Sequence, residues 1–315
     1  MYKKGRGAGE LGLCFAYSFY PSLALILSTP TGRGSRKKKK RSRKGSPKRQ
    51  IILQFSTAMY SSSVISVLAL AATAVGAPTV YLAGDSTMAR GNSLITGWGV
   101  YLPYSLTVNV VNKAIGGRSA RSFTDEGRFD EIANLVQPGD IVVIEFGHND
   151  GGSLHQGDNG RTPCAGTGDE TCQSTYNGKQ VTVHTFNWYM KQAGQQMIAK
   201  GAKVIVSSQT TNNPWESGSF VYGSGGRFVG YAKDVAAALG SNATYVDHGL
   251  YSANMWKLLG KDETDSLFVQ GHTHTNAVGA DYVAGSFVKA LACAGGSFLQ
   301  GSIKNATDSI TGTCL

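Results

Sequence analysis

The sequence predicts a three-layer α/β/α domain built on a parallel sheet of five strands. Five short apolar runs, rich in β-branched residues, are separated by longer segments of mixed composition. The run Ile141–Ile144 is continuously apolar rather than alternating, as a strand buried on both faces should be. Every connection between runs is also at least a dozen residues long, which parallel strands need for a right-handed crossover.

The five expected strands follow one another between residues 79 and 247. They are Thr79–Ala83, Val108–Asn112, Ile141–Phe146, Lys203–Ser207 and Thr244–Asp247. Their spacing leaves room for a covering helix or a long loop after each one, so we expect helices on both faces of the sheet.

Helices are expected where apolar periodicity and capping residues agree. We expect them over Val181–Lys200, Arg227–Leu239 and Ala277–Cys293, and Gly240 is a suitable C-cap for the second. In the third, apolar side chains recur every four residues on one face. The Gly-rich stretch from Gly151 to Gly178 is expected to be a long loop beside a binding cleft.

Most of the positive charge lies at the beginning of the chain. The 315 residues carry a net charge of +10, but residues 1–58 hold 14 of the 30 Lys and Arg and one acid, Glu10. The remainder therefore carries −3, which disfavours a nucleic-acid partner. The basic run Arg36–Lys44 is typical of a nuclear signal or a polyanion-binding arm. We favour a different interpretation, a wrongly extended gene start that is disordered, because the segment lacks a regular period and Met59 opens a better beginning.

Residues 59–77 have the features of a secretory signal peptide. The apolar stretch Val64–Ala72 is too short to span a bilayer comfortably, and the small residues Val75-Gly76-Ala77 follow it as a cleavage site. The region before the apolar stretch has no Lys or Arg, which departs from the usual pattern. We therefore expect a secreted, extracellular protein with one domain over residues 78–315, and no membrane association after cleavage.

Four of the five cysteines lie in residues 78–315. An even number in a secreted chain indicates two disulfides, with three possible pairings. Pairing of nearest neighbours would join Cys164 to Cys172 and Cys293 to Cys314. A zinc site is the rival interpretation, and it is disfavoured because the sequence has neither a CxxC pair nor a Cys/His cluster.

Ser86 is the candidate nucleophile. It follows the first strand in Gly84-Asp85-Ser86, at the sheet edge where open α/β sheets place their chemistry. A helix N-cap is the alternative interpretation, since Gly-Asp-Ser is also ordinary turn composition. A serine hydroxyl needs a base, and His274, on a loop before the last helix, is the candidate.

Candidate donors for an oxyanion follow neighbouring strands. The backbone N–H groups of Ser86 and Gly117 and the side-chain amide of Asn149 could stabilise the negative charge that develops on a carbonyl oxygen. Each also has a plain structural interpretation: Gly117 permits a turn, Asn149 caps a helix, and His274 is a structural histidine. Their convergence on one sheet edge favours catalysis.

With these residues in place, the chain resembles the GDSL, or SGNH, hydrolases, and among them the fungal rhamnogalacturonan acetylesterases. The matching blocks extend over almost all of residues 78–315. They are residues 84–88, 97–99, 117–122, 145–153, 207–210, 212–216, 245–248 and 272–275. The resemblance implies a flavodoxin-like fold, Ser86 as nucleophile, Gly117 and Asn149 in the oxyanion hole, His274 as base, and both nearest-neighbour disulfides. It also implies acetyl esters on the rhamnogalacturonan of pectin as substrate.

The chain departs from this family at one important position. The family's last block reads Asp-x-x-His, whereas the residue three before His274 is Gly271. In serine hydrolases, loss of the acid that orients the imidazole costs on the order of 10⁴-fold in turnover. Three explanations stay open: a weak or inactive relative, a substitute acid such as Asp265 or Asp262, or a sequence error.

Other residues carry weaker functional interpretations. His272 and His274 have a spacing that suits metal chelation, but no third ligand is indicated, and we expect neither a metal nor a cofactor. Asp85 is expected to be a buried acid that accepts loop N–H bonds. Trp98 and Trp215 pack in the interior or stack on sugars.

Arg118, Arg121 and Arg128 either contact galacturonate carboxylates or form a solvated helix face. Glycosylation sequons begin at Asn242 and Asn305 and fit an extracellular location. We expect a monomeric carbohydrate esterase acting on acetylated plant cell-wall polysaccharide. The alternatives are a catalytically impaired polysaccharide-binding relative and an acetylesterase of another substrate, such as xylan.

Overall fold

The computed structural model describes residues 76–223, 225–304 and 312–315. The expected basic leader, residues 1–58, and the expected signal peptide up to residue 75 lie outside the described residues, as does the sequon at Asn305. The fold described below lies within the unit Leu70–Leu315.

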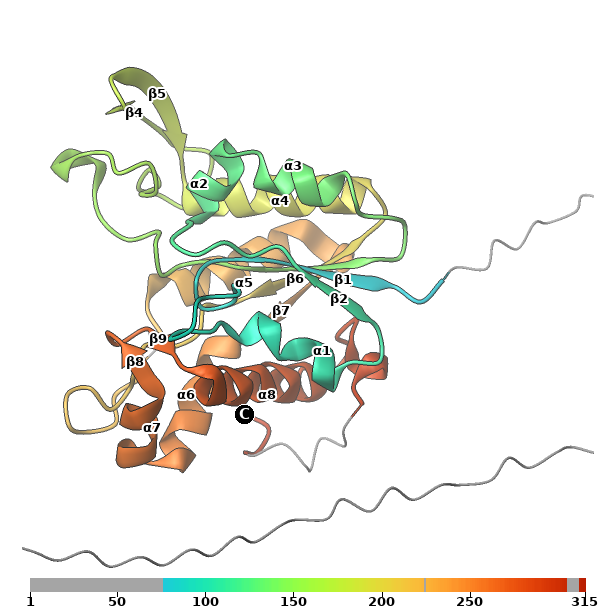
Figure 1. The fold of residues 1–315 in the computed structure, drawn as a ribbon. Helices are drawn as coiled ribbons and strands as arrows, with labels where there is room; N and C mark the ends of the chain where they lie inside the picture. Colours follow the sequence, from blue (N-terminus) through green and yellow to red (C-terminus); the bar gives the residue numbers. More distant parts are fainter. Residues whose placement is uncertain (1–75, 224, 305–311) are drawn as a thin grey trace, which may run out of the picture. The chain divides into compact units, whose positions relative to one another are not determined.

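Five parallel strands form the central sheet (Figure 1). They are β1 (Thr79–Gly84), β2 (Asn109–Asn112), β3 (Ile141–Glu145), β6 (Lys203–Ser207) and β7 (Ala243–Val246). Their order is β2-β1-β3-β6-β7, and every neighbouring pair is parallel. The predicted five-stranded parallel sheet is confirmed, with each strand end within one residue of its expected position.

The chain reverses its direction of winding at β1, which lies between β2 and β3. Open α/β sheets bind ligands at such a switch point, outside the carboxyl ends of the strands. The register aligns Gly84 of β1 with Glu145 of β3, and Glu145 with Ser207 of β6. The loops that begin after these three residues therefore emerge side by side at one edge.

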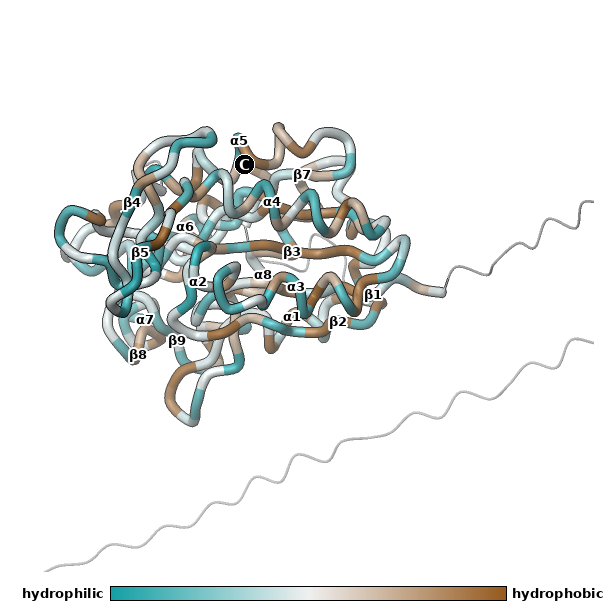
Figure 2. Tube along the Cα trace, turned by 90° about the horizontal axis from the view of Figure 1, so that it is seen from above, coloured by the Kyte–Doolittle hydropathy of each residue, from teal (hydrophilic) through white to brown (hydrophobic). Residues whose placement is uncertain are grey.

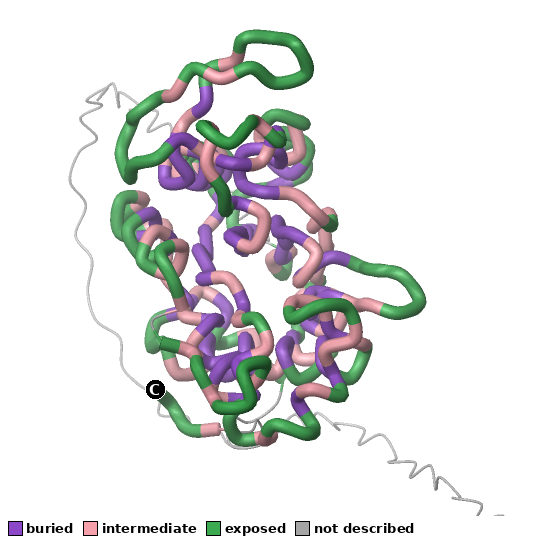
Figure 3. The backbone as a smooth tube through the Cα atoms, turned by 90° about the vertical axis from the view of Figure 1, so that its left-hand side faces the viewer, coloured by how far each residue is buried: buried purple, intermediate pink, exposed green. Residues whose placement is uncertain are grey.

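Two helical layers cover the sheet because successive strand side chains point to opposite faces. In β3, Val142 and Ile144 belong to one apolar cluster, and Ile141 and Val143 belong to the other. Figure 2 shows β3 as hydrophobic along most of its length, and the strand ends at Glu145. Figure 3 shows buried residues in the interior and exposed ones along the peripheral loops.

One layer contains four helices: α2 (Ala120–Asp125), α3 (Arg128–Ala133), α4 (Phe186–Ala199) and α5 (Arg227–Leu239). The other contains α1 (Leu102–Ser105), α6 (His248–Leu259), α7 (Lys261–Leu267) and α8 (Ala277–Cys293). Figure 1 shows α2, α3 and α4 on one side of the sheet and α1, α6 and α8 on the other. The predicted bounds of α5 and α8 are confirmed, and Gly240 is the C-cap of α5 with a φ of 70°.

The remaining elements are short. They are η1 (Trp98–Val100), η2 (Leu154–Gln156), η3 (Gly240–Asn242), η4 (Gln300–Ser302) and the strand pair β8 (Phe268–Gln270) and β9 (His274–Thr275). Within the described part of the chain, no helix combines the length and apolarity needed to cross a membrane.

A β-hairpin stands where we predicted a loop and the start of a helix. β4 (Thr171–Tyr176) pairs with β5 (Lys179–His184) in antiparallel register across Asn177 and Gly178, whose φ angles are 51° and 74°. The predicted helix Val181–Lys200 is therefore wrong in its first turn, and the predicted loop Gly151–Gly178 is wrong at its end. Asn-Gly adopts the positive φ pair of a two-residue hairpin turn, and the flanking Thr and Val residues favour strands.

Both nearest-neighbour disulfides are confirmed. Cys164 is bonded to Cys172, and Cys293 is bonded to Cys314. The first closes the segment that leads into the β4–β5 hairpin, and the second attaches the end of the described chain to the end of α8. The interpretation as a zinc site is contradicted, because these four thiols are used in the two bridges.

Candidate active site

Ser86 lies directly after β1, in a turn that Asp85 holds in place. The buried Asp85 carboxylate accepts hydrogen bonds from the backbone N–H and the hydroxyl of Thr87, both at 2.9 Å. The expectation that Asp85 accepts loop N–H bonds is confirmed. Gly84 is required just before this turn, because a Cβ there would lie 2.9 Å from the backbone carbonyl oxygen of Glu145. The Ser86 side chain therefore projects from a turn whose backbone these hydrogen bonds hold in one conformation.

The imidazole of His274 meets the Ser86 hydroxyl. His274 Nε2 lies 2.9 Å from Ser86 Oγ, and His274 Nδ1 lies 3.2 Å from the backbone carbonyl oxygen of Gln270. A carbonyl oxygen only accepts hydrogen bonds, so Nδ1 carries the proton and Nε2 offers its lone pair to the hydroxyl. This tautomer is the one that a general base for Ser86 requires.

Gly271 stands at the position where the family has the aspartate that orients the histidine, and the space for that side chain is open. Its φ is +60°, and a Cβ built on it would meet nothing within 4 Å. The candidate substitutes do not fill the gap. Asp265 is occupied by the Asn213 amide at 2.7 Å and by the Lys261 ammonium, while Asp262 lies in the exposed first turn of α7. Among the described residues, no carboxylate hydrogen-bonds His274.

The candidate oxyanion donors lie next to Ser86. A Cβ on Gly116 would be 3.7 Å from the Cβ of Ser86, so the backbone before Gly117 passes directly beside the nucleophile. Gly117 has a φ of +75°, which glycine adopts without strain. The Asn149 amide nitrogen donates to the carbonyl oxygen of Arg118 at 3.1 Å, which fixes the amide beside Gly117. One of its two N–H bonds is used in this way, and the second is left for a ligand.

Buried Asp150 joins the two donor loops. Its Oδ1 accepts a hydrogen bond at 2.9 Å from the backbone N–H of Ala120, at the start of α2. Burial raises the pKa of the Asp150 carboxyl well above its usual range, and the nearby Asp85 carboxylate raises it further. The loop after β3 and the loop after β2 are therefore connected directly behind Asn149.

A buried polar network lies beneath this edge and was not predicted from the sequence. The Glu145 carboxylate accepts hydrogen bonds from Trp98 Nε1 at 2.9 Å, from the Ser207 hydroxyl at 2.6 Å and from His248 Nδ1 at 2.8 Å. All four side chains are buried. The available signal was an acid at the end of a strand that is otherwise wholly apolar, since a buried carboxylate needs partners.

Trp98 packs in the interior, whereas Trp215 is half-buried. Trp98 is fully buried against His248 and Phe287, so it cannot stack on a sugar. Trp215 donates its indole N–H to the Trp256 carbonyl oxygen at 2.9 Å. The described residues also contain no group of three or more His, Cys, Asp or Glu side chains that is arranged to hold a metal ion.

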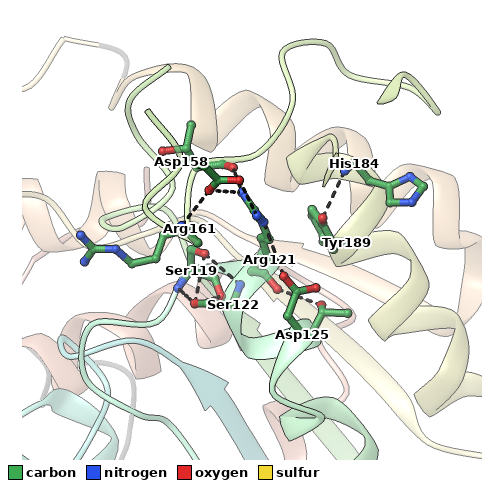
Figure 4. A network of polar contacts seen from close by, with 12 residues as sticks. Ser119, Arg121, Ser122, Asp125, Asp158, Arg161, His184 and Tyr189 are labelled. Atoms are coloured by element: carbon green, nitrogen blue, oxygen red, sulfur yellow. Dashed lines mark hydrogen bonds and ion pairs between the residues drawn. The ribbon is translucent and has the colours of Figure 1, made fainter. Parts of the chain in front are cut away.

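Two expectations about arginines are wrong for Arg121. Its side chain is 1% exposed, and its guanidinium binds both carboxylate oxygens of Asp158, at 2.8 and 2.9 Å (Figure 4). Arg121 is therefore neither solvated nor open to a substrate. The sequence could not show this, because its partner Asp158 lies 37 positions away along the chain. Arg118 pairs with Glu126, and Arg128 pairs with both Glu126 and Glu131.

Two surface pockets meet at His274. One is lined by Ser86 and His274 together with six threonines from loops and from β9: Thr87, Thr96, Thr210, Thr211, Thr273 and Thr275. The other is more open, and it contains Gly271, His272 and His274. The Ser86 hydroxyl and the His274 imidazole therefore lie where an extended ligand can reach them from solvent.

The sequence model of the GDSL-like lipase/acylhydrolase family matches residues 82–282 of this chain, which include all of the candidate site. The chain belongs to that family. Membership makes the protein a carboxylic ester hydrolase.

Individual GDSL relatives agree with this assignment. A rhamnogalacturonan acetylesterase of Emericella nidulans is 56% identical over 219 residues, which cover 70% of this chain and 86% of the relative. The rhamnogalacturonan acetylesterase RhgT of Bacillus subtilis is 43% identical over 76 residues, or 22% of this chain and 33% of the relative. The crystal structure of Bacillus subtilis YxiM superposes with a TM-score of 0.54 at 24% identity, covering 68% of this chain and 56% of that chain, which supports the shared fold.

Proposed function

We propose that this protein is a secreted serine esterase that removes acetyl groups from the rhamnogalacturonan of pectin. The observation that carries the proposal is the 2.9 Å contact between His274 Nε2 and Ser86 Oγ, with the proton of the imidazole held on Nδ1 by the Gln270 carbonyl oxygen. The proposed substrate is supported by the 56% identity to a rhamnogalacturonan acetylesterase over most of that relative.

The geometry supports a two-step acyl transfer. Ser86 Oγ attacks the acetyl carbonyl carbon while His274 Nε2 takes the hydroxyl proton. The negative charge on the carbonyl oxygen is stabilised by the backbone N–H groups of Ser86 and Gly117 and by the free N–H of Asn149. The sugar alkoxide then leaves with the proton from His274. A water molecule, deprotonated by the same imidazole, attacks the acetyl-Ser86 ester and releases acetate.

Gln270 replaces part of what a triad acid supplies. Its carbonyl oxygen selects the tautomer and orients the ring, but it carries only a partial charge to stabilise the imidazolium that forms during the reaction. We therefore propose a working Ser86–His274 dyad with a lower turnover than a full triad would have. A polysaccharide-binding protein without turnover is the second candidate, and the lack of a carboxylate on His274 favours it.

Acetate release decides between these candidates. The full chain is expressed in a secreting fungal host, and the product is incubated with acetylated rhamnogalacturonan beside its Ser86→Ala variant and beside acetylated xylan. Release that Ser86→Ala abolishes, and that is faster on rhamnogalacturonan, supports the proposal. Binding of the polymer with equal, background release by both proteins would support the second candidate instead.

The proposed extracellular location has its own test. Two disulfides fit an oxidising compartment, where bridges of this kind persist. We propose that residues 59–77 are removed on export and that residues 78–315 act as a monomer. Sequencing the amino terminus of the secreted product should find Pro78, and sedimentation should give the mass of one chain. A product retained in the cells with residues 1–58 attached would contradict this proposal.

A further inference from the structure

Unlike the neighbouring arginines, Arg161 forms no salt bridge with any described residue. Within the described residues, its guanidinium forms one hydrogen bond, to Asn149 Oδ1 at 3.3 Å. The guanidinium groups of Arg118, Arg121 and Arg128 are each paired with at least one carboxylate. Arg161 therefore places a guanidinium that no described carboxylate hydrogen-bonds beside the candidate oxyanion hole.

The loop around Arg161 is fixed by several local contacts. The backbone N–H groups of Arg161 and Thr162 donate to Asn159 Oδ1 at 2.8 and 3.0 Å, and the Thr162 hydroxyl donates to the Gly151 carbonyl oxygen at 2.9 Å. The ion pair between Arg121 and Asp158 holds the segment just before it. The guanidinium of Arg161 is thus placed by the fold before any ligand arrives.

The side chain of Arg161 points away from that ion pair. Figure 4 shows it extending to the opposite side from Arg121 and Asp158. The side chain is half-buried, and the carboxyl group that lies near it, Asp150, has a pKa raised by burial. One guanidinium N–H donates to Asn149. The other N–H groups remain available as donors, and their planar arrangement suits a carboxylate.

We propose that Arg161 binds the carboxylate of a uronic acid residue in the substrate and so selects acidic polysaccharides over neutral ones. This inference rests on the proposed function, because it places the charged sugar beside the ester that Ser86 attacks. A uronic acid carries its carboxylate on the same ring as its acylated hydroxyls. The Arg161 guanidinium beside Asn149 can therefore bind that carboxylate while the acetyl group occupies the oxyanion hole.

A structural role for Arg161 makes a different prediction. If the guanidinium only orients the Asn149 amide, its loss should slow the hydrolysis of every acetyl ester equally, charged or neutral. If it binds a carboxylate, its loss should weaken the binding of charged ligands specifically, even when no reaction takes place. Equilibrium binding of a deacetylated ligand separates these two roles.

The experiment measures that binding by calorimetry. The wild-type protein, Arg161→Gln, Arg161→Lys and the control Arg128→Gln are titrated with deacetylated rhamnogalacturonan oligosaccharide and with the same oligosaccharide after its carboxylates are reduced to alcohols. We expect Arg161→Gln to weaken binding of the acidic oligosaccharide by about tenfold or more, the size of a lost charge-assisted hydrogen bond. Arg161→Lys should lose less, and Arg128→Gln should match the wild type. Binding of the reduced oligosaccharide should be the same in all four proteins.

Equal binding of the acidic and reduced oligosaccharides by the wild type would overturn the inference, and so would a preference for the acidic one that survives in Arg161→Gln. Thermal melting of each variant checks that the fold is kept. Since no acetyl group is present, failure of the proposed esterase activity would show itself separately, as absence of acetate release by a protein that still binds.

Discussion

His274 Nδ1 donates its hydrogen bond to the backbone carbonyl oxygen of Gln270, at 3.2 Å, where the family resemblance leads us to expect a carboxylate. The ring is therefore oriented by a main-chain group that no substitution of a side chain removes. What the carbonyl lacks is the full negative charge that stabilises an imidazolium. This difference gives the clearest prediction about turnover.

Gly271→Asp should increase acetyl-ester turnover. Its Cβ would enter open space, and aspartate is among the residues that tolerate a φ near +60°. We expect kcat to rise by about 10²-fold, part of the roughly 10⁴-fold effect of a triad acid. Gly271→Asn has nearly the same size without the charge, and steady-state kinetics should place it near the wild type. Equal rates for both variants would mean that the Gln270 carbonyl already suffices.

Ser86→Ala and His274→Ala should lower turnover by similar amounts, and the double variant should be no slower than either one. Residues that act as a unit in one step are non-additive, because the remaining partner contributes little alone. Single-turnover kinetics with a neutral acetate ester measures all three variants. If the two losses multiply in the double variant, the imidazole does not act through the Ser86 hydroxyl.

Glu145→Leu should destabilise the fold by about 3–5 kcal/mol, because several buried hydrogen-bond donors lose their shared acceptor. The substitution leaves the donors of Trp98, Ser207 and His248 without their acceptor in a region closed to water. Urea unfolding gives the free energy. For comparison, His272→Ala removes a solvent-exposed contact with Glu216 and should cost less than about 1 kcal/mol. Similar losses for the two variants would show that the network contributes no more than a surface pair.

Asp150→Asn should become more stable, relative to the wild type, as the pH rises from about 4. Burial raises the pKa of Asp150 in the folded protein, so between the unfolded and the folded pKa the native state holds a proton that the unfolded state has lost. The contribution of Asp150 to the free energy of unfolding therefore falls through this window, whereas an amide does not titrate. Chemical denaturation of both proteins at several pH values measures the difference. A difference that is constant, or that falls with pH, would contradict the assignment.

The central sheet and two long helices could be predicted because their signals are local. Continuous apolar runs mark strands such as Ile141–Glu145, and four-residue periodicity marks α8. The β4–β5 hairpin was missed although its Asn177-Gly178 turn is also a local signal, because the glycine-rich composition before it suggested a loop.

The candidate dyad and oxyanion donors could be named from the sequence, but their surroundings could not. The partner of Arg121 lies 37 positions away, and the partner of His248 lies 103 positions away, so neither pair leaves a pattern along the chain. The Gln270 carbonyl could not be foreseen at all, because every residue carries a backbone carbonyl and only the folded path decides which one meets a ring. Arg161 was overlooked for a related reason: its lack of a salt bridge with any described residue is a property of the folded chain.

The five strands of the sheet are complete by Val246, whereas His274 follows 28 positions later and 188 positions after Ser86. During synthesis from the amino terminus, the sheet can therefore assemble on the ribosome while the nucleophile still lacks its base. A nascent chain of this design holds a serine hydroxyl that no imidazole can activate. If Ser86 and His274 act as proposed, esterase activity begins only when nearly the whole domain has been made.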